Sequence, residues 1–308
     1  MASQTPRLVT AKDVFEIAQI PFLMVISWMV PERHWPAVAR LIARLITSLF
    51  AKRTRKRRQR LGRLFDGRIN PTVLNRMEII LITHRYVARM QGYREYRPNG
   101  WRPDIKVVGA KHIDAALAAG HGVVLWVTPF PYSHLVTKKG LHESGYRVSH
   151  LSRSAHGFSP SRFGCRFLNP IWTRIEDRYL AERVRLDAGA GPGAAIAILR
   201  RRLQQNRIVS ITATRFARKT IGVDFFNIEL RLPTGPARLA RTAQAALLPV
   251  FTVLTDTGVL EVNIESPLNR SRAEQSDEPA EAVIQQYGRK LEHYVLKYPG
   301  QSVPELGL

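Results

Sequence analysis

The stretch over residues 232–251, LPTGPARLARTAQAALLPVF, has the residue types of an anion-binding helix start. We expect Thr234-Gly235-Pro236 to open an Ala-rich helix over residues 234–246, with Thr234 as the N-cap. The first backbone N–H groups and the positive end of the helix dipole would then face an anion. The alternative is a capped helix packed in the core. The residues alone favour that alternative.

Three other kinds of side chain could carry chemistry. Ser133 adjoins His134, but neighbours on a helix face different directions, so we expect Ser133 to be an N-cap rather than half of a dyad. Cys165 lies beside Arg166, which would lower a thiol pKa, although a lone cysteine is more often a small buried hydrophobe. Three histidines, His142, His150 and His156, follow no known spacing of metal ligands. A cysteine pair is also missing, so no metal site is predicted.

Net charge is the unusual bulk property. The chain has 47 Lys and Arg against 24 Asp and Glu, a net charge of +23, which attracts nucleic acid, anionic lipid or acidic proteins. A hydrophobic share of 45% is enough to bury a globular core in 308 residues. The one cysteine excludes an internal disulfide framework and fits a reducing compartment.

The N-terminal sequence selects among these partners. Residues 17–30 read IAQIPFLMVISWMV, which is shorter than the roughly 20 apolar residues of a full bilayer span and contains Pro21. Residues 36–50 form an amphipathic helix with Arg40 and Arg44 on an otherwise apolar surface. The cluster KRTRKRRQR follows at residues 52–60.

Together these three features predict a helical membrane anchor over residues 1–65. Each cation near an anionic surface contributes about 1 kcal/mol to binding, and basic clusters favour the cytoplasmic side. A buried helical hairpin with a solvated basic face is the alternative. Nucleic-acid binding ranks below the membrane, because nucleic-acid sites interleave aromatic residues with cations and this cluster has none. We therefore expect no nucleic-acid partner.

Strands and helices alternate through residues 66–308, which predicts one α/β domain with a mostly parallel central sheet covered by helices. The continuous apolar run VVLWV is typical of a buried central strand. We expect strands over residues 105–108, 123–127, 147–151, 208–212, 248–254 and 260–264. We expect helices over residues 75–90, 112–119, 133–144, 194–205, 234–246 and 279–297, and a surface loop over 269–278.

The order of these segments resembles the late lipid A acyltransferases, the lauroyl/myristoyl transferase family of the lysophospholipid acyltransferases. That family has a stretch PFFG…PTGPARLA…APVVPVF, and here it reads DFFN…LPTGPARLARTAQAALLPVF. The resemblance also covers residues 113–127, IDAALAAGHGVVLWV, and the ending Tyr298-Pro299-Gly300-Gln301. It implies transfer of a fatty acyl chain from acyl carrier protein or acyl-CoA to a lipid hydroxyl at the inner membrane.

The family's catalytic motif is altered in this chain. The family carries His-x4-Glu/Asp after the strand that VVLWV matches. Here Pro129 falls at the histidine position and His134 at the carboxylate position. The family's Asp-Gln pair is replaced by Thr212-Ala213-Thr214-Arg215, and its Arg-rich ending by Ser302-Val303-Pro304.

Two explanations follow. In the first, acyl transfer is retained, and His134 at a helix start serves as the general base with Glu143 or Asp224 as its carboxylate. Substrate would then be held by residues that the resemblance suggests: Arg153, Thr234, Gly235 and Arg238. In the second, the chain is an inactive homologue that binds lipid or an acyl group as a scaffold subunit. Without a base the reaction slows by roughly 10²–10⁴-fold.

The resemblance also implies the partners and the location. We expect anionic membrane lipids, acyl carrier protein and a lipid or other hydrophobic acceptor, at the cytoplasmic face of the inner membrane. No cofactor is expected beyond the acyl donor. A basic tract over residues 162–185 is equally a solvated face or a docking surface for the carrier protein or lipid phosphate, and its arginines are Arg162, Arg166, Arg174, Arg178, Arg183 and Arg185.

Overall fold

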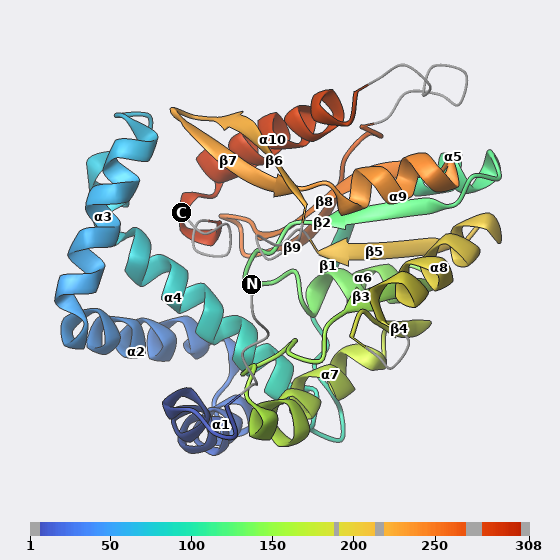
Figure 1. The fold of residues 1–308 in the computed structure, drawn as a ribbon. Coiled ribbons are helices and arrows are strands. Elements are labelled where there is room, and N and C mark those ends of the chain that lie inside the picture. The colour runs from blue at the N-terminus through green and yellow to red at the C-terminus, as the bar shows by residue number, and fades with distance from the viewer. Residues whose placement is uncertain (1–6, 188–190, 213–218, 269–278, 303–308) are drawn as a thin grey trace.

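A seven-stranded sheet forms the centre of the molecule (Figure 1). The computed structural model describes residues 7–187, 191–212, 219–268 and 279–302. The strand order is β1-β9-β8-β2-β5-β3-β4, and every neighbouring pair is parallel except β8 with β9. The strands are β1 (Ile105–Val108), β2 (Val123–Val127), β3 (Val148–Ser152), β4 (Glu182–Arg185), β5 (Ile208–Thr212), β8 (Ala246–Leu254) and β9 (Leu260–Ile264). The predicted α/β class with a mostly parallel sheet is confirmed.

Strand β2 lies in the middle of the sheet and is buried along its whole length. Its side chains alternate between two cores, as the two-residue period of a strand requires. Val124 and Trp126 join the core under α8 (Gly191–Gln204), α9 (Gly235–Ala243) and α10 (Ala280–Lys297). Val123, Leu125 and Val127 join the other core, with residues of α4 (Pro71–Arg94), α5 (Lys111–Ala118) and α6 (Val136–Glu143).

Several elements were not predicted. The helix α7 (Asn169–Asp177) and strand β4 both lie in the segment expected to be a basic tract. A separate antiparallel hairpin joins β6 (Thr220–Phe225) to β7 (Ile228–Pro233). The hairpin packs against α10 rather than extending the main sheet.

The N-terminal residues form three helices on one side of the molecule, α1 (Ala11–Met29), α2 (Trp35–Leu49) and α3 (Ala51–Phe65) (Figure 1). All three pack on α4, which has contacts with each of them. Among the described residues, no helix combines the length and apolarity that crossing a bilayer requires. A membrane anchor over residues 1–65 therefore stays a prediction.

Some predictions fall outside the described residues. They are the altered Asp-Gln position at residues 213–215, the surface loop at 269–278 and the chain end from Val303.

Candidate functional site

A histidine and a buried carboxylate meet at the carboxyl end of the parallel strands. His156 follows β3, and its Nε2 lies 2.9 Å from Oε1 and 3.0 Å from Oε2 of Glu176 on α7. A carboxylate only accepts hydrogen bonds, so Nε2 donates and Nδ1 is left as the ring nitrogen that can accept a proton. This is the arrangement of a histidine general base with an orienting carboxylate.

Buried cations keep this carboxylate ionised. Glu176 is fully buried, with Arg183 Nη2 at 2.6 Å and Lys138 Nζ at 3.5 Å. Burial alone would raise the pKa of Glu176, but His156, Lys138 and Arg183 together hold that pKa well below its usual range. A carboxylate ionised at neutral pH can orient His156 and stabilise its protonated form.

The loop that carries His156 is fixed by Asn169. Its Oδ1 accepts hydrogen bonds from the N–H groups of Phe158 at 2.7 Å and Ser159 at 3.0 Å. Its Nδ2 donates to the carbonyls of Ser154 at 3.1 Å and Ser159 at 2.8 Å. Gly157 has a φ of +125°, and a Cβ there would come within 2.9 Å of Asn169, so the tight turn requires glycine. The His156 ring is therefore held from both the backbone and Glu176.

His134, the residue predicted to be the base, lies beside this pair. Its ring centroid is 5.3 Å from that of His156. The helix expected from residue 133 begins instead at Val136, because the chain first closes a turn in which Ser133 Oγ donates to the Phe130 carbonyl. Ser133 is thus not an N-cap, and His134 precedes the helix, so the prediction of a helix start at these residues was wrong.

The carboxylates proposed for His134 lie elsewhere. Glu143, at the end of α6, pairs with Lys139 at 3.3 Å. Asp224 is on β6 of the small hairpin, where its backbone exchanges hydrogen bonds with Gln285. Glu176 was missed because it comes 20 residues after His156, and no sequence spacing marks that pair. No helix was predicted over residues 169–177, so Glu176 was not placed on a helix near the His156 loop.

His134, His156 and Glu176 each offer one ligand atom, and these atoms lie within 4.8 Å of one another. Two histidines and one carboxylate are a donor set that zinc accepts. However, Lys138 and Arg183 already balance the Glu176 charge, and a divalent cation would add repulsion in a buried position. The electrostatics therefore favour proton transfer over metal binding.

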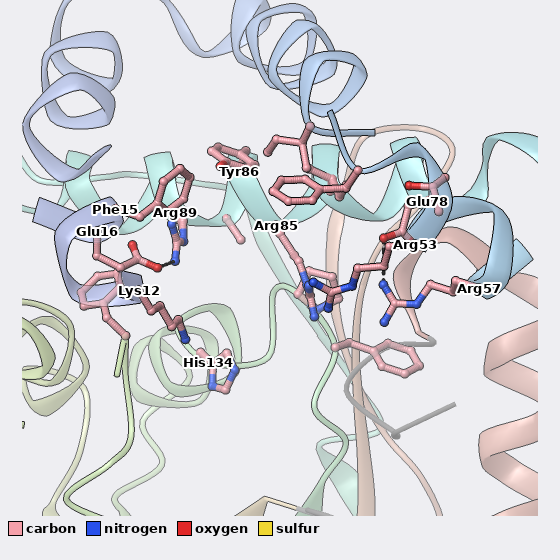
Figure 2. Close-up of a pocket in the computed structure, with 18 of the residues that line it drawn as sticks. Lys12, Phe15, Glu16, Arg53, Arg57, Glu78, Arg85, Tyr86, Arg89 and His134 are labelled. Carbon is pink, nitrogen blue, oxygen red and sulfur yellow. Dashed lines mark hydrogen bonds and ion pairs between the residues drawn. The ribbon is translucent and has the colours of Figure 1, made fainter. Parts of the chain in front are cut away.

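A cavity of about 950 Å³ opens beside the two histidines. Figure 2 shows Arg53, Arg57 and Arg85 on one side and Lys12 and His134 on the other. Its apolar wall includes Phe15, Ile46, Phe50, Phe130 and Phe158. The polybasic stretch thus forms α3 and lines the cavity with some of its cations, which are Arg53, Lys56, Arg57 and Arg60.

The other predicted binding residues are spread over two places. Arg153 is exposed at the start of the His156 loop, where its carbonyl accepts a hydrogen bond from the His156 N–H. Thr234 and Arg238 line a second hollow of about 420 Å³, with Lys219, Arg231 and Arg241. Gly235 is the first residue of α9, and the Thr234 hydroxyl donates to the Lys219 carbonyl at 3.5 Å rather than capping the helix.

The arginine tract and Cys165 also have structural explanations. Arg183 is buried between Glu176 and Asp177, and Arg178 donates to the Glu95 carbonyl at 2.9 Å. The tract is therefore not one solvated face. Burial raises the pKa of the Cys165 thiol, which is the opposite of what its cationic neighbours suggested.

Comparison with known proteins supports the expected resemblance. Residues 166–301 match the family described as bacterial lipid A biosynthesis acyltransferase. The match begins after His134 and His156, and it includes Glu176, the hairpin and the α9 segment.

Two curated relatives come from strains of Mycobacterium tuberculosis. Both are phosphatidylinositol mannoside acyltransferases and are 34% identical to this chain, over 169 and 147 residues. The alignments cover 54% and 47% of this chain and 46% and 43% of the relatives, so the chain spans about half the length of the relatives it matches. Residues 166–301 thus resemble lipid A acyltransferases; a place for the whole chain in the lauroyl/myristoyl branch stays a prediction.

Proposed function

We propose that this protein transfers a fatty acyl chain to a hydroxyl group of a lipid at the surface of an anionic membrane, with His156 as the general base. The observation that carries the proposal is the 2.9 Å contact between His156 Nε2 and the buried Glu176 carboxylate, at the wall of a basic and apolar cavity. The pair supplies the base that the Pro129 substitution removes from the expected motif.

In the proposed reaction, His156 accepts one proton and later returns it. Nδ1 of His156 accepts the proton of the acceptor hydroxyl while that oxygen attacks the thioester carbonyl of acyl carrier protein or acyl-CoA. The tetrahedral intermediate then expels the thiolate as the C–S bond breaks, and the imidazolium returns its proton to that sulfur. Glu176 stabilises the imidazolium in between. Such a base contributes roughly 10²–10⁴-fold to the rate.

The cavity lining suits an anionic lipid. Phe15, Phe50 and Phe130 offer a surface for acyl chains, and the arginines of α3 offer charge for a phosphate. A guanidinium binds phosphate through paired hydrogen bonds, which gives orientation as well as affinity. The named relatives act on a phosphatidylinositol mannoside, which supports a phosphate-bearing acceptor here.

Membrane binding is proposed from the outer surface of α1 and α2. The two helices expose large apolar side chains, which are Val14, Phe22, Val25, Met29, Leu41, Leu45 and Leu49. Exposed apolar helix surfaces next to cations are typical of proteins that lie in the membrane interface. Arg40 and Arg44 are exposed on α2, and Lys52 is exposed at the start of α3, so these cations would meet anionic headgroups.

The test is transfer of a labelled acyl chain from acyl carrier protein or acyl-CoA to a total lipid extract. We expect His156→Ala and Glu176→Gln each to lose about 10²-fold or more in rate, while the exposed His293→Ala variant retains wild-type rate. If His134→Ala abolishes transfer and His156→Ala does not, His134 is the base. Loss of activity on metal chelation would instead indicate a metal site.

The same assay tests the alternative that the protein is an inactive homologue. If the wild type moves no label but binds the acyl donor and anionic vesicles, the protein is an acyl-binding subunit that has lost transfer.

A further inference from the structure

We propose that Asp13 is a positioning residue that couples docking of α1 on a bilayer to the loop that holds His156. This inference rests on the proposed function. Its starting point is the orientation of α1, which buries Asp13, Glu16 and Ser27 while exposing Val25 and Met29 at 61% and 79%. The helix also buries Ile20 and Leu23, so its orientation is set by polar contacts together with these two apolar side chains.

Asp13 makes the first of these contacts at the N-terminus of α1. Its Oδ2 accepts hydrogen bonds from the Thr10 N–H at 2.6 Å and from the Thr10 hydroxyl at 2.8 Å. Burial alone would raise the pKa of Asp13, but the hydroxyls of Ser159 and Thr10 lower it to about 2. The carboxylate is therefore charged, and it lies against the segment that follows His156.

Close packing and backbone pairing join the same two segments. A Cβ at Gly164 would come within 3.0 Å of Asp13 Oδ1 and within 2.5 Å of the Ser159 Cβ, so only glycine fits between them. The N–H groups of Arg162 and Phe163 donate to the carbonyls of Arg7 and Leu8, each at 3.0 Å. Residues 7–13 and 159–164 thus form one connected unit.

That unit extends to the base through Asn169. Ser159 donates its N–H to Asn169 Oδ1, and its carbonyl accepts from Asn169 Nδ2 at 2.8 Å. The same Asn169 Oδ1 holds the Phe158 N–H, two residues from His156. A displacement of α1 would therefore be transmitted to the His156 loop through the packing of Asp13 on Gly164, the backbone pairing of residues 7–8 with 162–163, and the hydrogen bonds of Asn169.

A bilayer would bind the outer surface of α1 and fix the position of this helix. The N-terminal residues of the helix would then hold residues 159–164, and His156 would keep its distance to Glu176. The predicted consequence is that anionic vesicles raise the rate of acyl transfer through Asp13, beyond their effect on substrate concentration.

The experiment compares wild type, Asp13→Ala and the charge-matched control Asp256→Ala, an exposed residue in the β8–β9 turn. Hydrogen exchange of the Arg162 and Phe163 amides is measured with and without phosphatidylglycerol vesicles. We expect vesicles to slow exchange about tenfold in wild type and in Asp256→Ala, within the usual range of coupling between sites. In Asp13→Ala we expect unchanged vesicle affinity and no slowing.

A kinetic readout separates positioning from folding. With vesicle-bound acceptor, Asp13→Ala should lower kcat about tenfold and leave KM unchanged. Asp13→Asn should have a kcat between those of Asp13→Ala and wild type, because its amide oxygen still accepts hydrogen bonds from Thr10. Equal slowing of exchange in Asp13→Ala would overturn the inference, and so would loss of vesicle binding. Because exchange does not depend on catalysis, a wild type that transfers no label but shows the slowing would defeat only the proposed function.

Discussion

The helices α1 and α10 are of similar length, but α10 buries mainly apolar side chains whereas α1 buries a mixture of polar and apolar ones. Helix α10 turns an apolar face inward, made of Val283, Ile284, Tyr287, Leu291, Tyr294 and Val295. Helix α1 turns inward Asp13, Glu16, Ile20, Leu23 and Ser27, and leaves much of its apolar surface exposed.

This difference means that the two helices are held in the fold by different interactions, and that only α1 keeps a large apolar surface exposed. Helix α10 is held by apolar burial, which needs no exact partner. Helix α1 is held in part by buried polar contacts, including the ion pair of Glu16 and Arg89 at 2.7 Å. Its apolar surface therefore contributes little to folding and remains available for another apolar phase, which we propose is the membrane interface.

The largest effect is expected in the α10 core. Tyr287 stacks on Trp126 with ring centroids 3.9 Å apart, and its hydroxyl lies 2.5 Å from that of Thr128. Tyr287→Ala should lower the free energy of unfolding by about 3–5 kcal/mol, since it leaves a large cavity. Urea unfolding measures this free energy. If anionic vesicles restored the stability of Tyr287→Ala, the contrast between α10 and α1 would be contradicted.

Breaking the α1 ion pair should cost somewhat less. Arg89→Met leaves the Glu16 carboxylate buried without its cation, and we expect a loss of about 3 kcal/mol in the free energy of unfolding. A quarter of the Arg89 side chain is exposed, which places the effect at the low end. The double variant Glu16→Gln/Arg89→Met should recover most of the loss; no recovery would mean that the pair does not hold α1.

A substitution on the outer surface of α1 should affect binding and not folding. Val25→Glu should change the free energy of unfolding by no more than about 0.5 kcal/mol. It should weaken binding to anionic vesicles about tenfold, because one apolar side chain of this size no longer enters the interface. Vesicle co-sedimentation measures the affinity, and an unchanged affinity would remove the proposed membrane role of this surface.

The smallest expected effect is the loss of the Asp13 contribution to stability at low pH. The pKa of Asp13 falls from 3.8 in a free carboxyl to about 2 in the folded protein. Its contribution to stability is therefore present above about pH 4 and lost as the pH falls toward 2. Protection of residues 7–13 from protease should fall over that range in wild type. The Asp13→Asn variant should lack this component, which distinguishes Asp13 from Glu176 and Glu265, whose pKa values are also lowered.

Local patterns were enough to predict much of the sheet. The strands β1, β2, β5 and β9 match the predicted bounds, because each is a short apolar or alternating run between turn residues. The hairpin β6–β7 was missed, since its pattern of exposed and buried residues is irregular. Strand β4 was missed because ERVR has the pattern of a charged tract, and the pairing of Arg183 with Glu176 and Asp177 is visible only in the structure.

The candidate site could be predicted only in part. His134 was recognised because it follows β2 near the altered family motif. His156 was set aside as a single histidine, and Glu176 was not considered, because pairing across 20 residues depends on how the chain folds between the His156 loop and α7. The arginines of α3 were predicted to contact lipid from outside, yet four cations of that helix line the cavity.

The sequence by itself determined the α/β class, the central strand, the net charge of +23 and the resemblance to lipid A acyltransferases. The first three follow from composition and short-range periodicity, which every segment carries locally. The resemblance rests instead on the matched stretches, above all LPTGPARLARTAQAALLPVF. Only the tertiary structure decided which carboxylate faces which histidine and which side of α1 is buried. Both depend on contacts between residues distant in the chain, whose free energies come from burial and from neighbouring charges that no local pattern records.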